Sequence, residues 1–131
     1  MTIKEYSFEK LTVWNEIRDL IRLIYSLTSI FPIEEKFGIS NQMRRSAISI
    51  GSNLAEGSSK KSSKDQSRFY NISYSSLLEL LSQTIVCKDL NYIDEEKYFA
   101  IRNSIQSISY KLNSLRNKAT EKANIDNSNF K

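Results

Sequence analysis

Six basic side chains in the middle of the sequence have the charge and spacing to bind phosphate. Between Asn41 and Arg68 only Glu56 and Asp65 oppose them, and the rest of the chain carries thirteen residues of each sign. The formal net charge of +4 therefore belongs to this segment. Such a surface attracts phosphate backbones, which makes it a candidate nucleic-acid-binding site. Its basic residues are Arg44, Arg45, Lys60, Lys61, Lys64 and Arg68.

The residues around the basic side chains indicate how nucleic acid would be recognised. No aromatic residue is interleaved with Lys60, Lys61 and Lys64 to stack on bases, and Tyr70, considered for that role, is equally suited to packing. We therefore expect recognition of shape and backbone, with strong salt dependence. The competing interpretation is a basic loop that only keeps the protein soluble.

The composition argues against catalysis and against metal or cofactor binding. The chain has no histidine and a single cysteine, so no zinc site or Cys/His nucleophile can be assembled. No phosphate-cradling Gly-rich loop is present. Arg45, Asn53, Glu56 and Glu79 have catalytic functional groups, but on adjoining helices such residues more often form a hydrogen-bond network. We expect a non-enzymatic protein.

Helices must position these residues. The sequence has three glycines and one proline, too few for the turns of an all-β chain. Apolar residues recur at three- and four-residue steps, with Phe31-Pro32 ending the first segment, and Ser63 and Asp94 placed to cap the last two. The expected helices are 11–31, 40–57, 63–90 and 94–122.

Four amphipathic helices with short connectors predict an all-α fold, an up-down-up-down antiparallel four-helix bundle. A single domain over residues 1–122 accounts for the whole pattern. Residues 123–131 are polar and unpatterned, and we expect a disordered C-terminal tail there.

The segment 40–57 presents three faces when it is projected as a helix. Met43, Ala47, Ile50 and Leu54 form a core stripe. We expect the small residues of a second face, Ile48, Gly51 and Ala55, to admit a neighbouring helix. We also expect Arg44 or Arg45 to pair with Glu56 or Glu79. The residues assigned to an oligomer interface or structural network are Ile48, Gly51, Asn53, Ala55, Glu56 and Glu79.

Two features bear on location. The lone Cys87 lies in an apolar helical pattern, which fits a reducing compartment. No apolar run approaches the roughly 18 residues that a membrane span needs. We expect a cytoplasmic protein that does not enter membranes.

Several motifs carry a resemblance to a known family. In order along residues 8–120, the chain resembles the small bacterial four-helix bundle proteins encoded in intervening sequences of large-subunit (23S) ribosomal RNA genes. It departs from their commoner pattern at Gly51, where many members have proline, and at Ser75, where glycine is frequent. The matching motifs are Val13-Trp14, Ile24-Tyr25, Phe31-Pro32, Phe37-Gly38-Ile39, QMRRSA from Gln42, SIGSNLAEG from Ser49, Ser76-Leu77 and Glu79-Leu80.

The resemblance implies an all-helical bundle and a homo-oligomer, since related bundles form pentamers. Similar accessory proteins of diversity-generating retroelements use a basic surface to engage a reverse transcriptase and RNA. Our first hypothesis is a non-enzymatic oligomer that binds RNA or other nucleic acid. The alternative is a protein-interaction scaffold without nucleic-acid binding. A toxin-type ribonuclease is disfavoured, because such bundles typically rely on a histidine that this chain lacks.

Overall fold

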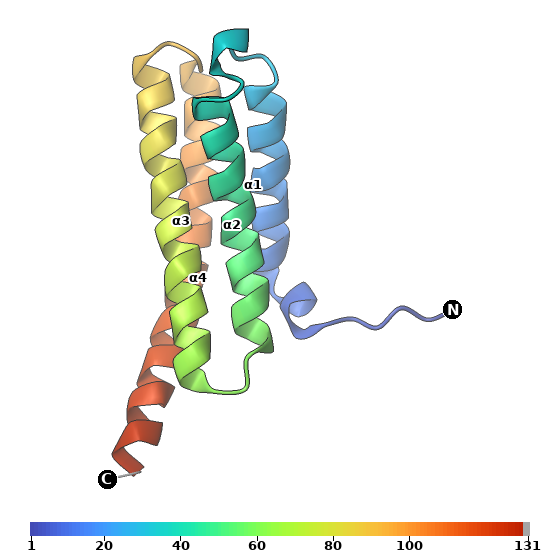
Figure 1. The fold of residues 1–131 in the computed structure, drawn as a ribbon, viewed down its shortest axis with the longest axis vertical. Helices are drawn as coiled ribbons and strands as arrows, with labels where there is room; N and C mark the ends of the chain where they lie inside the picture. The colour runs from blue at the N-terminus through green and yellow to red at the C-terminus, as the bar shows by residue number, and fades with distance from the viewer. Residues whose placement is uncertain (130–131) are drawn as a thin grey trace.

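Four long helices, each antiparallel to the next along the chain, make up the computed structural model, which describes residues 1–129 (Figure 1). Within that range there is no strand, so the prediction of an all-α four-helix bundle is confirmed. Short 3-10 helices precede the first two helices. The elements are η1 (Ser7–Lys10), α1 (Thr12–Thr28), η2 (Ile33–Glu35), α2 (Ile39–Ser59), α3 (Ser63–Asp89) and α4 (Glu95–Asn129).

The core lies along the bundle axis, and every helix contributes an apolar stripe to it. The predicted stripe of α2 is fully buried, and α4 contributes the buried residues Ile101, Ile105, Ile108, Leu112 and Ala119. Burial of these branched side chains is the main source of stability. The largest side chains with essentially no exposed surface are Ile17, Leu20, Ile24, Met43, Ile50, Leu54, Leu77, Leu80, Ile101, Ile108 and Leu112.

A polar seam joins α2 to α3 beside this core. The Ser73 hydroxyl donates to the Ile50 carbonyl at 2.7 Å, which satisfies a buried hydroxyl against the neighbouring backbone. Ser49 and Ser76 share a hydrogen bond of 2.8 Å between their hydroxyls. Serines at these positions let the two helices approach closely, because their side chains are small. The α2–α3 seam consists of Ser46, Ser49, Ser73, Ser76 and Glu79.

Two helix ends differ from the sequence-based expectation. The cap of α3 is Ser62, one residue before the expected Ser63, and its hydroxyl accepts a hydrogen bond from the Asp65 N–H at 3.1 Å. Ser63 is instead buried in the first turn. The first helix ends at Thr28, before Phe31, because Phe31 turns inward and packs its ring 5.4 Å from that of Tyr92.

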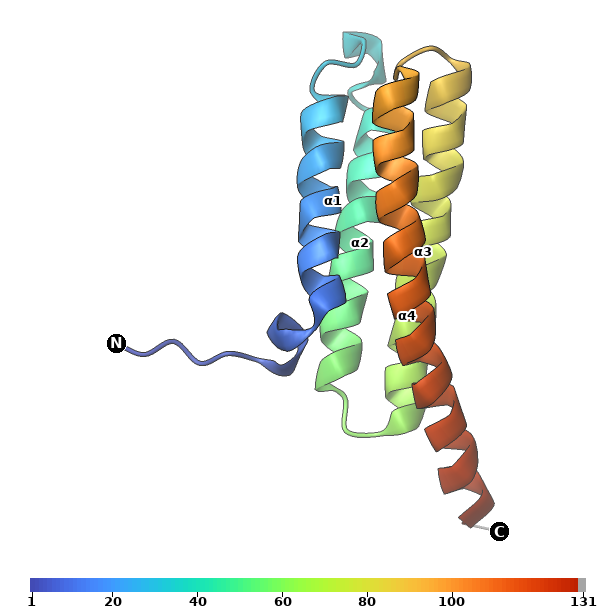
Figure 2. The same ribbon diagram turned by 180° about the vertical axis from the view of Figure 1, so that it is seen from behind.

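The C-terminal end also differs. α4 continues to Asn129 and extends past the other helices, where a disordered tail was expected from residue 123 (Figure 2). No proline or glycine interrupts this segment, so the backbone hydrogen bonds of the helix can continue. The side chains from Thr120 to Ser128 are mostly exposed, which explains why no apolar pattern marked them. Residues 130–131 of the expected tail lie outside the described residues.

An ion pair ties α1 to α4 across the bundle surface. Lys111 Nζ lies 2.5 Å from Glu16 Oε2, and Ser107 also donates to the Glu16 carboxylate. Burial raises the pKa of Glu16, but the hydrogen bonds from Lys111 and Ser107 and the Lys111 charge outweigh it. The pKa therefore lies below its ordinary value of 4.5.

Within residues 1–129, no helix is both long and apolar enough to cross a membrane.

The lowered pKa of Glu16 predicts a pH-dependent contribution to stability. A carboxylate whose folded pKa lies below the unfolded one stabilises the fold above the unfolded pKa, and this contribution disappears as pH falls through the folded value. Glu16→Gln should lower the free energy of unfolding by up to about 1 kcal/mol at pH 7 and have little effect at about pH 2.5. Urea denaturation at both pH values measures this, with the exposed Glu121→Gln as control. An equal loss at both pH values would contradict it.

Candidate nucleic-acid interface

The tight connection between α2 and α3 positions four of the six predicted basic residues. Only residues 60–62 join the two helices, and hydrogen bonds hold both sides of this turn. The Lys60 N–H donates to the Gly57 carbonyl at 3.2 Å, and the Gln66 side chain donates to the Lys60 carbonyl at 3.3 Å. We call this the basic end of the bundle and define it as Lys60, Lys61, Lys64 and Arg68.

An aromatic ring lies among these cations. Lys60 Nζ and the Arg68 guanidinium carbon each lie 5.0 Å from the centroid of the Phe69 ring, within the range of a cation–π interaction. Lys60 also lies 3.6 Å from the Glu56 carboxylate. Lys61 and Lys64 are exposed and form no ion pair among the described residues. Two cations therefore remain free, and two flank an aromatic surface.

Of the two roles considered for Tyr70, stacking and packing, the structure supports packing. Tyr70 is only 6% exposed, and burial raises the pKa of its hydroxyl, so this side chain belongs to the packing rather than to a stacking surface. Phe69 is half-buried and occupies the position between Lys60 and Arg68. The position of Phe69 next to Arg68, near the start of a helix, could have indicated its role from the sequence. Its contact with Lys60 could not, because that contact depends on the turn between α2 and α3.

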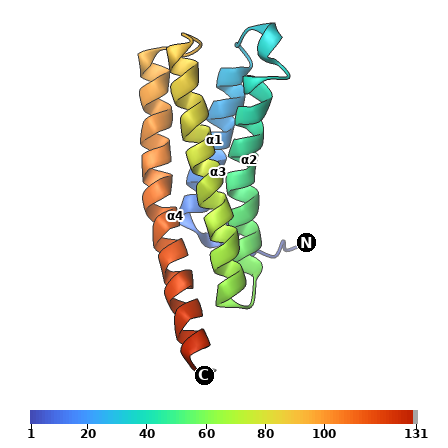
Figure 3. The same ribbon diagram turned by 60° about the vertical axis from the view of Figure 1, so that its left-hand side comes forward.

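A second group of basic residues adjoins this end from α4. Ser67 of α3 shares a 2.9 Å hydrogen bond with Thr120, which places the C-terminal part of α4 beside the start of α3 (Figure 3). Arg116 stacks over the ring of Tyr74 of α3 at 4.0 Å, and the neighbouring Lys118 and Lys122 are exposed. These residues lie far along the chain from residues 41–68, so the local concentration of charge gave no sign of them.

Arg44 and Arg45 do not belong to the basic end. They lie near the other end of α2, and the rise of an α-helix separates Arg45 from Lys60 by about 22 Å along its axis. Arg44 is bound to α1: its Nε donates to the Thr28 hydroxyl at 2.8 Å, and its guanidinium lies 4.5 Å from the centroid of the Tyr25 ring. The six basic residues therefore form two separate groups.

The expected pairing of Arg44 or Arg45 with Glu56 or Glu79 is wrong. Glu56 faces Lys60, and Glu79 accepts hydrogen bonds from Ser46 at 3.0 Å and from Gln83 at 3.3 Å. Neutral hydroxyl and amide donors thus replace the expected arginine in this network. Asn53 also contributes, because its amide donates to the Ser49 carbonyl at 2.9 Å.

The second face of α2 packs mainly inside the chain. A Cβ atom on Gly51 would lie 3.3 Å from side-chain atoms of both Trp14 and Ile17, so the glycine lets α1 approach closely. Ala55 is half-buried, and Ile48 is 43% exposed. The close neighbour that this face admits is therefore α1 of the same chain, and only Ile48 is well exposed to another molecule.

Acidic and sulfur ligands do not gather into a metal site in the part of the chain that the structure describes. No group of three or more aspartate, glutamate, histidine or cysteine residues lies close enough there to hold an ion. The lone Cys87 is buried beside the Met43 sulfur at 3.5 Å. Burial, with a smaller contribution from Glu35, raises the pKa of its thiol to about 11, so it stays protonated near neutral pH.

The fold and this site define a small helical bundle with a basic, aromatic-containing end. Residues 9–114 match the family model described as 23S rRNA-intervening sequence protein, and the chain belongs to that family. The chain is also similar, at 25% identity, to a protein of unknown function from the S23 ribosomal protein family of Bacteroides thetaiotaomicron VPI-5482. That crystal structure superposes with a TM-score of 0.72, covering 80% of this chain and 98% of the other. No curated protein matches the chain significantly.

The close packing around Gly57 predicts that a larger residue at this position destabilises the protein. A Cβ atom there would lie 2.8 Å from the Tyr70 ring and 3.1 Å from Phe69 Cβ. Gly57→Ala should therefore destabilise the protein by about 1–3 kcal/mol, because overpacking the buried ring outweighs the better helix propensity of alanine. Thermal denaturation measures the loss, with the exposed neighbour Ser59→Ala as control. A stabilised Gly57→Ala variant would contradict the contact.

Proposed function

We propose that this protein is a non-enzymatic, cytoplasmic nucleic-acid-binding protein that contacts the RNA backbone through its basic end. One observation carries the proposal: Lys60 and Arg68 flank the Phe69 ring while Lys61 and Lys64 remain exposed beside it. The cations would neutralise phosphates, and the ring would offer one base a stacking surface. The family's association with 23S rRNA intervening sequences supports RNA as the polymer.

The basic residues of α4 support a binding surface wider than the turn itself. Arg116, Lys118 and Lys122 adjoin the start of α3, where Ser67 and Thr120 are hydrogen-bonded. If nucleic acid lies across both the α2–α3 turn and the adjoining part of α4, the protein contacts more of its phosphates than residues 60–68 alone could reach. Such a surface recognises charge and shape, and its affinity falls steeply with salt.

We further propose that the protein acts as a homo-oligomer, the pentamer that the family resemblance implies. Apolar side chains on the outer side of α3 support this: Leu78, Ile85 and Val86 are 46%, 39% and 46% exposed. Their spacing of seven and eight residues places them on one helix face. Large apolar side chains exposed together on one helix face are typical of an interaction surface.

The same apolar face favours a second candidate function. If Leu78, Ile85 and Val86 bind another protein, such as the reverse transcriptase that the resemblance implies, the bundle would act as a scaffold and the basic end would serve only solubility. The two candidates differ in one property: only the first requires affinity for nucleic acid.

RNA binding by the basic end predicts a specific loss of affinity. Reversing the two exposed charges, with Lys61→Glu and Lys64→Glu, should weaken binding to a structured RNA at least about tenfold at 50 mM salt. The slope of log affinity against log salt should become less steep by about 1.5, since two phosphate contacts are lost. Fluorescence anisotropy between 50 and 300 mM salt measures both quantities.

A matched variant separates this effect from a change in overall charge. Arg18→Glu with Lys97→Glu makes the same change in net charge at exposed positions away from the basic end, and it should bind RNA with little loss. Light scattering on all three proteins checks that assembly is unchanged. If the intact protein forms an oligomer but binds no RNA, the scaffold function replaces the first proposal. An equal loss in both variants would show that the basic end is not the site.

A further inference from the structure

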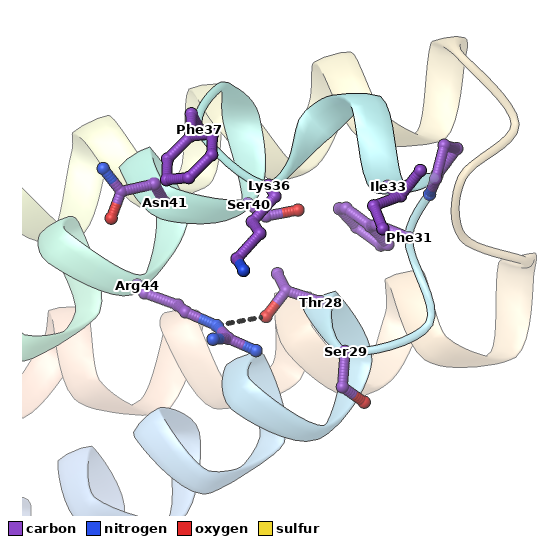
Figure 4. Close-up of a pocket in the computed structure, with 10 residues that line it drawn as sticks. Thr28, Ser29, Phe31, Ile33, Lys36, Phe37, Ser40, Asn41 and Arg44 are labelled. Atoms are coloured by element: carbon purple, nitrogen blue, oxygen red, sulfur yellow. Dashed lines mark hydrogen bonds between the residues drawn. The ribbon is translucent and has the colours of Figure 1, made fainter.

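A cavity opens at the end of the bundle opposite the basic end. It lies where α1 ends, the η2 connector crosses over and α2 begins, and its volume is about 540 Å³ (Figure 4). This volume falls in the range of small-molecule sites. The lining residues that matter for its chemistry are Thr28, Ile33, Lys36, Phe37, Ser40 and Arg44.

Two cations line this cavity. Arg44 is held by hydrogen bonds from its Nε to Thr28 at 2.8 Å and from Nη2 to the Tyr25 carbonyl at 3.3 Å. Nη1 makes no hydrogen bond to another described residue, so a positioned donor remains. Lys36 extends toward the same space in Figure 4 and forms no ion pair within residues 1–129. The pair supplies two positive charges in one concave site.

The Ser40 hydroxyl adds a further donor to the cavity. Ser40 is only 6% exposed, lines the cavity, and its hydroxyl makes no hydrogen bond to another residue of the described chain. The hydroxyl can therefore donate to an acceptor on a ligand in the cavity. Ser40 lies in the first turn of α2, where the helix dipole favours an anion, and the Ile39 N–H of the same turn donates to the Glu35 carboxylate at 3.4 Å.

The rim of the cavity is apolar. Phe37 and Ile33 are 86% and 80% exposed, and both line the opening. Lys36 Nζ lies 5.6 Å from the centroid of the Phe37 ring, so the aromatic surface is next to the charge. A ligand that matches both parts carries an anionic group for the interior and a flat or apolar group for Phe37.

From this arrangement we propose that the cavity binds a phosphate monoester attached to an aromatic group, of the nucleoside 5′-monophosphate type. The dianionic phosphate matches Lys36 and Arg44 in charge and accepts hydrogen bonds from Ser40 and the free Arg44 nitrogen. The base stacks on Phe37. The same chemistry is presented by a free nucleotide and by the 5′-phosphorylated end of an RNA strand. This site is independent of the basic end, which contains none of its residues.

Isothermal titration of the full-length protein with adenosine 5′-monophosphate tests the proposal. The nucleotide should bind saturably and at least about tenfold more tightly than adenosine, because the phosphate makes the charged contacts. Lys36→Gln should weaken nucleotide binding about tenfold, and Ser40→Ala by a smaller factor. Lys61→Gln, the same substitution at the basic end, should leave binding unchanged.

The outcomes separate clearly. Equal affinity for nucleotide and adenosine, no nucleotide binding at millimolar concentration, or an equal loss in Lys36→Gln and Lys61→Gln would overturn the proposal. Lys36 is exposed and forms no ion pair among the described residues, so Lys36→Gln should retain the thermal stability of the intact protein.

Binding of short RNAs with a 5′-phosphate or a 5′-hydroxyl shows whether the ligand is a free nucleotide or an RNA end. Phosphate-dependent RNA binding that Lys36→Gln weakens supports an RNA end as ligand, and nucleotide binding alone supports a free nucleotide.

Discussion

The close approach of α2 and α3 is the constraint on which the rest of the structure depends. The Ser73 hydroxyl reaches the Ile50 carbonyl at 2.7 Å, and the small serine side chains of the seam allow this approach. At the end of this contact, Gly57 leaves room for the buried Tyr70 ring. A turn of residues 60–62 can then join the helices and bring Lys60 over Phe69. The proposed binding surface is thus a consequence of backbone packing.

The length of α2 separates the basic residues into two groups with different surroundings. Arg44 lies near the start of α2 and is bound to α1, whereas Lys60 directly follows the last residue of α2 and contacts Phe69 of α3. At the basic end the cations are mostly exposed, which suits a flexible polymer backbone. At the other end, a fixed arginine and a buried serine enclose a cavity, which suits a small, directional anion. The net charge of the chain does not distinguish between these two groups of basic residues.

The sequence predicts most of the fold and part of the site. Repeats of three and four residues located all four helices and buried stripes such as Met43, Ala47, Ile50 and Leu54, because helix periodicity is a local property. Glu79 was correctly expected in a polar network, but its partner Ser46 and the roles of Phe69 and Arg116 could not be found in this way, since their contacts join different helices. The cap at Ser62 was missed because Ser62 and Ser63 have equal capping chemistry, and only burial of Ser63 decides between them.

Photo-crosslinking tests the central claim, RNA binding at the basic end, most directly. A structured RNA with a 5′-hydroxyl and internal 4-thiouridines would be irradiated with the intact protein, and the crosslinked peptides identified by mass spectrometry. RNA bound at the basic end should crosslink within residues 60–69 and on the adjoining part of α4 around residues 116–122. Crosslinks confined to residues 36–45 or to the outer face of α3 around Leu78 and Ile85 would contradict it.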